Sequence, residues 1–295
     1  MTETTVKTQE ILDSVKRVPV LSPGASQLLD AIGKADYQVS DIVRIIETDP
    51  ALTVSVLKTV NAAAMGLRRE VDSIREALAF LGETKVVGIA LAASAGEVFN
   101  ADLAGYHGSR GDLGRHSLWT AIAARELSRH TGGRVERGVA FTAGLLHDIG
   151  KAVISDYLAE DLDRLASLRE EIGDGDQLDL EHRTVGTDHA DVGQALARHW
   201  NMPASLVAAI RYHHAPQEAP DAFRTMAYTV HTADMLAMMF GVGTGADDMQ
   251  YTLDPDYRDH LDIDTGGLEG LALDVQVDFK ATAEALFGDN QETEA

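Results

Sequence analysis

The distribution of histidine along this sequence needs a chemical explanation. Ten of the eleven histidines lie between positions 107 and 231, and the first 106 residues contain none. The imidazole ring is a common ligand for transition metals. It is also an ordinary residue at helix ends and inside cores, so each histidine has to be weighed by its surroundings.

One subset of these histidines shares an unusual context. Its members stand beside carboxylates, at the ends or on the apolar faces of predicted helices: His116, His147, Asp148, His189, His213, His214 and Asp234. A carboxylate inside an apolar helix, such as Asp234, is costly to bury unless it is paired or bound to a metal. A single "HD" or "HH" pair arises by chance and has an ordinary structural interpretation. As an ordered set, these residues predict a metal site of imidazole and carboxylate ligands, which suits iron, manganese or zinc.

Composition narrows the class of protein. The chain has 295 residues and no cysteine, which excludes disulfides, thiolate zinc sites and cysteine nucleophiles. It carries 47 acidic and 25 basic residues, a formal charge of −22, so nucleic acid and anionic membrane surfaces are poor partners. No segment reaches the roughly 20 apolar residues of a membrane span, and the N-terminus lacks a signal-peptide core. We therefore expect a soluble, cytoplasmic protein.

Helical periodicity dominates the first 105 residues. Residues 40–64 carry isoleucine, leucine and valine at helical spacing, with Ser40 as the expected N-cap. Asp49-Pro50 should end that helix and start the next, because proline suits the first helical turn. Residues 73–99 read as two helices broken near Gly82. The sequence contains no convincing strand alternation, so the expected fold is an all-α multi-helix bundle.

The second part of the chain continues the helical pattern. Helices are expected at roughly 116–131, 135–149, 152–172, 188–200, 203–213 and 222–240, with a short one ending the chain at 278–287. Glycine-rich and polar segments at 100–117 and 173–179 should be loops. We expect an N-terminal helical subdomain over 1–105, packed on a metal-binding subdomain over 106–295 that includes a C-terminal extension.

At this point the sequence resembles a known family. His116, His147-Asp148 and Asp234 match the ligand signature of the HD superfamily of metal-dependent phosphohydrolases. The segments "VPVLSPGASQLLDAI", "AFTAGLLHDIGKAVI" and "VHTADMLA", with others between them, resemble an HDOD domain, the HD-related output domain of bacterial signalling proteins. The resemblance covers roughly residues 15–240. It implies an N-terminal helical subdomain packed on an HD-like one.

The resemblance also implies roles for the site residues. Asp148 would bridge two metal ions, of which one is completed by His116, His147 and Asp234. The other would be held by three further residues, which match second-metal positions of the related HD-GYP phosphodiesterases: His189, His213 and His214. Iron or manganese is the first expectation for both ions, with zinc or nickel as alternatives.

Three hypotheses describe the function of the predicted metal site. HDOD domains are described as signalling modules, which implies protein partners. An active phosphohydrolase on a nucleotide-type substrate is the alternative, and a purely structural metal site in a partner-binding module is the third. The GYP segment is missing after His189, which argues against cyclic-di-GMP hydrolysis. Lys151 would hold the phosphate of a phosphorylated small-molecule ligand, or would simply be a solvated lysine near a helix end.

Overall fold

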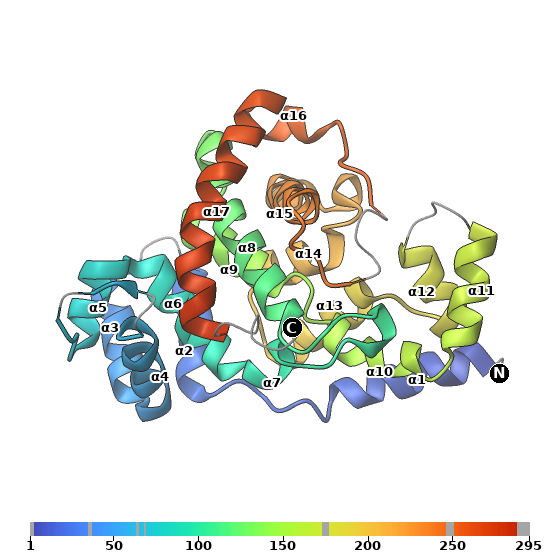
Figure 1. Ribbon diagram of the computed structural model, residues 1–295, viewed down its shortest axis with the longest axis horizontal. Coiled ribbons are helices and arrows are strands. Elements are labelled where there is room, and N and C mark those ends of the chain that lie inside the picture. Colours follow the sequence, from blue (N-terminus) through green and yellow to red (C-terminus); the bar gives the residue numbers. More distant parts are fainter. Residues whose placement is uncertain are drawn as a thin grey trace, which may run out of the picture.

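The described residues form helices joined by loops and turns. The computed structural model describes residues 3–34, 37–62, 65–67, 69–172, 177–245 and 251–287 (Figure 1). Within these ranges there are helices and one isolated bridge, between Leu103 and Gly108, but no strand. The predicted all-α class is therefore confirmed. The helices of the first part are α1 Glu3–Val15, α2 Pro23–Ile32, α3 Val39–Thr48, α4 Pro50–Val60, α5 Ile74–Leu81, α6 Glu83–Ser94 and α7 Gly96–Phe99.

Two helix junctions in this part were predicted from the sequence. Asp49 separates α3 from α4, and its Oδ1 accepts hydrogen bonds from the backbone N–H groups of Ala51 (3.0 Å) and Leu52 (3.2 Å). Gly82 separates α5 from α6 with φ = 78°, a conformation that glycine adopts without steric cost. The expected N-cap at Ser40 is wrong. Helix α3 begins at Val39 and its N-cap is Gln38, two residues before the expected one, because the Asp41 carboxylate accepts a hydrogen bond from the backbone N–H of Gln38.

The second part supplies the longer helices. These are α8 Asp112–Leu127, α9 Arg137–Leu146, α10 Lys151–Ala159, α11 Leu162–Ile172, α12 Gln177–Val185, α13 His189–His199, α14 Ala204–Tyr212, α15 Asp221–Met239, α16 Tyr257–His260 and α17 Thr265–Phe287. Helix α8 packs against α9, α15 and α17, and carries the fully buried Trp119. The approach of α8 to α9 needs Gly144, since a Cβ there would lie 2.8 Å from the backbone of Thr120 and Ala121.

Several expected boundaries in this part were wrong. Helix α8 begins at Asp112 rather than near His116, because the Asp112 carboxylate accepts a hydrogen bond from the Ser109 N–H at 2.6 Å and starts the helix there. The single helix expected over 152–172 is two helices, α10 and α11. Residues 177–179, expected in a loop, begin α12, while 173–176 lie outside the described residues. Helix α17 begins at Thr265, well before the expected 278.

Helix α1 lies apart from the rest of the first hundred residues. It packs against α10, α12 and α13, whereas α2 to α6 pack with one another at the other end of the molecule (Figure 1). The Thr8 hydroxyl donates a hydrogen bond to the Gly186 carbonyl at 3.1 Å. The division of the chain at residue 105 stays a prediction.

Among the described residues, no single helix is both long and apolar enough to cross a membrane. Helices α5 and α6 have the required length and composition only when taken together, and the chain bends by 119° between them.

Candidate metal centre

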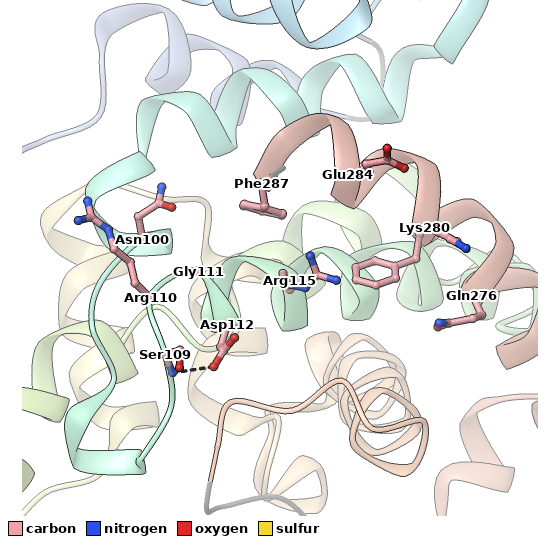
Figure 2. Close-up of a pocket in the computed structure, with 11 residues that line it drawn as sticks. Asn100, Ser109, Arg110, Gly111, Asp112, Arg115, Gln276, Lys280, Glu284 and Phe287 are labelled. Carbon is pink, nitrogen blue, oxygen red and sulfur yellow. Dashed lines mark hydrogen bonds between the residues drawn. The ribbon is translucent and has the colours of Figure 1, made fainter. Parts of the chain in front are cut away.

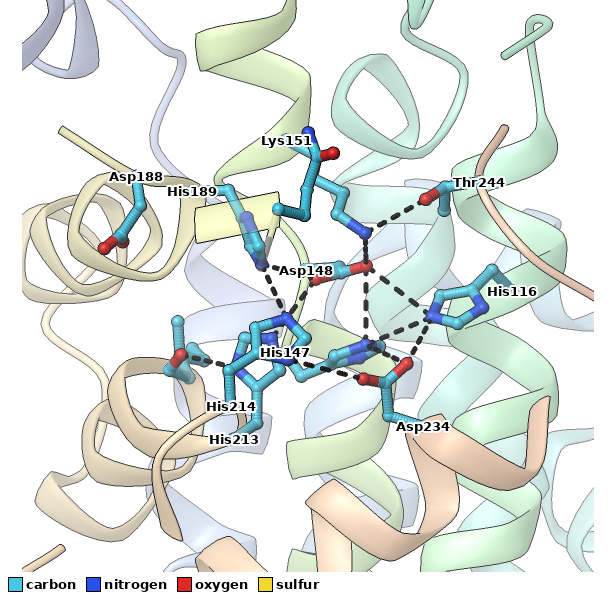
Figure 3. A network of polar contacts seen from close by, with 12 residues as sticks. His116, His147, Asp148, Lys151, Asp188, His189, His213, His214, Asp234 and Thr244 are labelled. Carbon is cyan, nitrogen blue, oxygen red and sulfur yellow. Dashed lines mark hydrogen bonds and ion pairs between the residues drawn. The ribbon is translucent and has the colours of Figure 1, made fainter. Parts of the chain in front are cut away.

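Five helices bring the predicted ligands to one point (Figure 3). His116 lies in the second turn of α8, His147 and Asp148 follow α9 directly, and His189 is the first residue of α13. The adjacent pair His213-His214 follows α14, and Asp234 lies within α15. Every one of these side chains is at most 3% exposed to solvent. The structure therefore brings all seven predicted residues together in one buried cluster.

Asp148 stands at the centre, with each carboxylate oxygen facing a different pair of histidines. Its Oδ2 lies 3.5 Å from Nε2 of both His116 and His147. Its Oδ1 lies 3.4 Å from Nε2 of both His189 and His213. A carboxylate placed between two sets of imidazole nitrogens in this way can bridge two cations.

The spacing of these atoms suits metal coordination. Asp234 Oδ1 lies 3.0 Å from His116 Nε2 and 3.5 Å from His147 Nε2. Ligands held about 2.1 Å from a metal stand about 3.0 Å apart at octahedral angles and about 3.4 Å apart at tetrahedral angles. The measured separations fall in this range without any rearrangement.

Hydrogen bonds fix the direction of the histidine rings. Nδ1 of His116, His147 and His213 lies 2.7–2.8 Å from the backbone carbonyls of Val242, Gly144 and Ile210 respectively. A ring that donates its Nδ1–H to a carbonyl presents the lone pair of Nε2, here toward the cluster. Metal-binding histidines are held in this way, with the second nitrogen donating to a carbonyl or carboxylate.

Two ring nitrogens of the cluster face one another without an obvious proton between them. Nε2 of His116 and Nε2 of His147 are 3.2 Å apart, although both rings use Nδ1 as the donor to a carbonyl. In the neutral rings this arrangement opposes two lone pairs. A cation between them removes the repulsion, and so does a proton on His116, whose pKa burial would lower but the Asp234 carboxylate raises.

Several buried atoms of the cluster lack hydrogen bonds. Within the described part of the chain, Asp148 Oδ1, Asp234 Oδ2, His213 Nε2 and His214 Nδ1 have no hydrogen-bond partner, and their ion-pair contacts within the cluster are 3.4–4.0 Å long. Burying polar atoms in this state costs about 1–3 kcal/mol each, and more for charged groups. Metal coordination would offset this cost, which is why these residues fit a metal ion.

The electrostatics favour the protonation states that metal binding requires at Asp148, His213 and His214. At His116 and His189 burial would lower the pKa, but the carboxylates of Asp234 and Glu181 raise it. Burial by itself would raise the pKa of Asp148, but the nearby positive charges of His147 and Lys151 hold it well below its usual range. Burial lowers the pKa of His213 to about 4 and takes that of His214 well below its ordinary value. Ionised carboxylates and neutral imidazoles are the forms that coordinate metals.

Glu181 was missed by the sequence analysis. Its Oε2 accepts hydrogen bonds from the His189 backbone N–H (2.8 Å) and from His189 Nδ1 (2.9 Å), and its Oε1 accepts from the Tyr106 hydroxyl (2.8 Å). Burial would lower the pKa of His189, but the charge of Glu181 raises it to about 9. Glu181 follows no motif, and its contact with His189 is made across the short connection between α12 and α13. His231 lies behind the cluster, where its Nδ1 is 2.7 Å from the His213 carbonyl.

Lys151 is not a solvated lysine. It begins α10, it is 1% exposed, and its Nζ lies 2.8 Å from Asp148 Oδ2 and 3.0 Å from the Thr244 hydroxyl (Figure 3). The ring of Tyr251, 5.9 Å from Lys151 Nζ, stacks on His214 with 4.0 Å between ring centroids. Thr244 and Tyr251 were not predicted, because they belong to a segment without helical pattern.

Comparisons with known proteins agree with this architecture. A model of the HDOD domain matches residues 18–216, which is more than half of the chain. The chain belongs to the HDOD family. An uncharacterized protein of Treponema pallidum (strain Nichols) is 31% identical over 240 residues; the match includes 79% of this chain but only 45% of that relative, so the chain spans less than half the length of the curated relative.

Solved structures share the fold at low identity. The HDOD domain protein of unknown function from Geobacter sulfurreducens superimposes with a TM-score of 0.72 and 22% identity, covering 96% of this chain and 97% of that one. A Marinobacter aquaeolei VT8 protein, provisionally named a signal transduction protein, superimposes with a TM-score of 0.78 and 19% identity, covering 96% of this chain and 65% of that one. A Shewanella amazonensis SB2B protein, provisionally named a phosphohydrolase, superimposes with a TM-score of 0.66 and 23% identity, covering 94% of this chain and 97% of that one. At these identities the comparison shows the fold alone.

Proposed function

We propose that this HDOD protein is a bacterial signal-transduction module with a dinuclear metal centre. His116, His147 and Asp234 would hold one ion, His189, His213 and His214 the other, and Asp148 would bridge them. Iron or manganese suits the mixed imidazole and carboxylate ligands best. The observation that carries the proposal is Asp148 itself, since each of its oxygens lies 3.4–3.5 Å from a separate pair of Nε2 atoms.

The burial of the cluster supports a signalling role over rapid turnover. Catalytic metals keep an open position for water and substrate, whereas structural sites are closed. Here Lys151, Thr244 and Tyr251 lie over the ligands, and the ligands themselves are almost fully buried. A closed centre would stabilise one arrangement of α8, α13, α14 and α15. A protein partner would bind the surface that this arrangement forms.

Metal analysis tests the proposal. Purified protein loaded with Mn²⁺ or Fe²⁺ should retain two ions per chain after desalting. Asp148→Asn, which keeps the shape of the bridge but removes its charge, should lose both. Asp30→Asn, at an exposed position of α2, is the matched control and should retain both. Wild-type protein without stoichiometric metal would contradict the proposal.

A phosphohydrolase is the second candidate, and Lys151 is the observation that favours it. A buried ammonium held against Asp148 is placed to bind a phosphate oxygen as a point charge. Bound metals would supply Lewis acidity to polarise a phosphoryl group. For substrate to enter, Tyr251 would have to leave His214, and Lys151 would have to exchange its contact with Thr244 for one with phosphate.

Turnover separates the two candidates. Metal-loaded protein should be assayed with bis(p-nitrophenyl) phosphate and with cyclic dinucleotides. Hydrolysis abolished by Asp148→Asn, and weakened mainly in KM by Lys151→Gln, would establish the enzyme. Two bound ions without hydrolysis that depends on Asp148 would leave the signalling module.

A further inference from the structure

A second polar pocket lies away from the histidine cluster. It has a volume of about 830 Å³ and opens between the loop before α8, the first turn of α8 and the end of α17 (Figure 2). Its charged and aromatic lining includes Arg110, Arg115, Lys280, Asp112, Glu284 and Phe287. Binding sites for small molecules are typically about 300–1,000 Å³ in volume. The pocket is therefore of the right size for a small organic ligand.

The three basic side chains of this pocket are unusual for such an acidic protein. Among the described residues, Arg110, Arg115 and Lys280 form no ion pair and no side-chain hydrogen bond, although the chain has 47 acidic residues against 25 basic ones. Arg115 is held at the pocket wall by the ring of Phe279, with 5.7 Å between its guanidinium carbon and the ring centroid. Cations that stay unpaired where acidic groups are abundant are available for an anionic ligand.

The carboxylates of the pocket do not cancel this charge. Asp112 accepts a hydrogen bond from the Ser109 N–H at 2.6 Å, which directs its carboxylate toward the start of α8. Among the described residues of the lining, Asp112 and Glu284 are the acidic ones, so the three basic side chains leave a net positive charge. The start of α8 adds partial positive charge, because the first N–H groups of a helix point out of its end.

We propose that this pocket binds a small molecule that carries a phosphate group, with nucleoside monophosphates as the chemical class. Arg110, Arg115 and Lys280 would contact the phosphate, and the ring of Phe287 would pack against the planar part of the ligand. The site is separate from the histidine cluster. Arg115 and His116 are neighbours on α8, but Arg115 lines the pocket whereas His116 faces Asp148 and Asp234.

Binding of AMP, adenosine and inorganic phosphate to the purified full chain tests the proposal by calorimetry. AMP should bind saturably, phosphate more weakly, and adenosine only marginally. Arg110→Ala/Lys280→Ala should weaken AMP binding about tenfold or more, since a hydrogen bond to a charged group contributes at least about one decade of affinity. Lys58→Ala/Arg75→Ala removes two exposed charges elsewhere and is the matched control; it should leave AMP binding unchanged.

A second pair of measurements separates this pocket from the metal centre. Arg110→Ala/Lys280→Ala should keep the metal content of the wild type. His189→Ala should lose metal from the cluster yet bind AMP as the wild type does. The proposal is overturned if AMP fails to bind, if the control double variant weakens binding equally, or if AMP binding disappears with His189. The metal content reports independently on the proposed function.

Discussion

Glu181 offers the sharpest test of the metal centre, because it acts only through His189. Its carboxylate accepts both from the backbone N–H and from Nδ1 of His189, at 2.8 and 2.9 Å. These contacts fix the ring so that Nε2 lies 3.4 Å from Asp148 Oδ1. In Glu181→Gln the shape is kept, but the negative charge is lost and one acceptor becomes a donor that opposes either Nδ1–H or the Tyr106 hydroxyl.

The size of the effect follows from these two bonds. Hydrogen bonds to a charged group are roughly twice as strong as neutral ones, so the substitution should cost about 1–3 kcal/mol at His189. This corresponds to about 10- to 100-fold weaker binding of the ion next to His189, in line with the usual effect of losing a partner of a metal-binding histidine. The ion held by His116, His147 and Asp234 should keep its affinity. Competition between the protein and a chelator for Mn²⁺ would resolve the two ions.

Two further variants sharpen this measurement. Tyr106→Phe removes only the hydroxyl that donates to Glu181, so it should weaken the same ion by a smaller factor. Glu160→Gln changes a carboxylate that is 65% exposed and should change neither ion. If Glu181→Gln, folded as judged by circular dichroism, binds both ions with wild-type affinity, then His189 is not a ligand held by Glu181 and the assignment of the second ion fails.

Three other outcomes are expected. Gly150→Ala would place a Cβ 1.9 Å from the backbone oxygen of His189, so the variant should lose about 3 kcal/mol of stability or fail to fold, measurable by urea unfolding. Chelation of the metal should lower the melting temperature by about 5 °C or more, since a ligand at a hundred times its Kd stabilises by about 2.7 kcal/mol; an unchanged melting temperature would count against a bound metal. Burial opposes ionisation of Asp278, but hydrogen bonds and charges from Lys85 and Arg125 keep its pKa below the usual value. That stabilisation is complete above the ordinary pKa of about 4 and declines as the pH falls toward the lowered pKa, so the stability difference between wild type and Asp278→Asn should shrink on acidification.

Sequence reasoning grouped the seven candidate ligands that the structure brings together, but it predicted only part of the helical frame. The grouping was possible because each feature is local: a histidine at a helix end, or Asp234 inside an apolar helix. Asp49 and Gly82 were predicted for the same reason, as capping and helix breaking depend on adjacent residues. The start of α8 was misplaced because Asp112 and Gly111 look like loop residues until the Ser109–Asp112 hydrogen bond is seen.

Residues that act across the fold left no comparable signal. Glu181 stands eight positions before His189 on a different helix, and Thr244 meets Lys151 from a segment 93 positions away. The solvated alternative for Lys151 followed from its position near the end of a predicted helix. The structure instead starts α10 at this residue and buries it.

The contacts of Lys151 connect the candidate metal ligands to the residues that lie over them, Thr244 and Tyr251. The ammonium lies 2.8 Å from the same Asp148 oxygen that faces His116 and His147, so it competes with a cation for that oxygen. Two positive charges that share one carboxylate oxygen repel each other, and a bound ion would weaken the contact of Lys151 with Asp148. Lys151 also contacts the Thr244 hydroxyl and lies near the ring of Tyr251, which stacks on His214. Metal binding would therefore act on the residues that cover the site as well as on the ligands. The same displacement serves a signalling module, by changing the surface, and a hydrolase, by freeing a cation for phosphate.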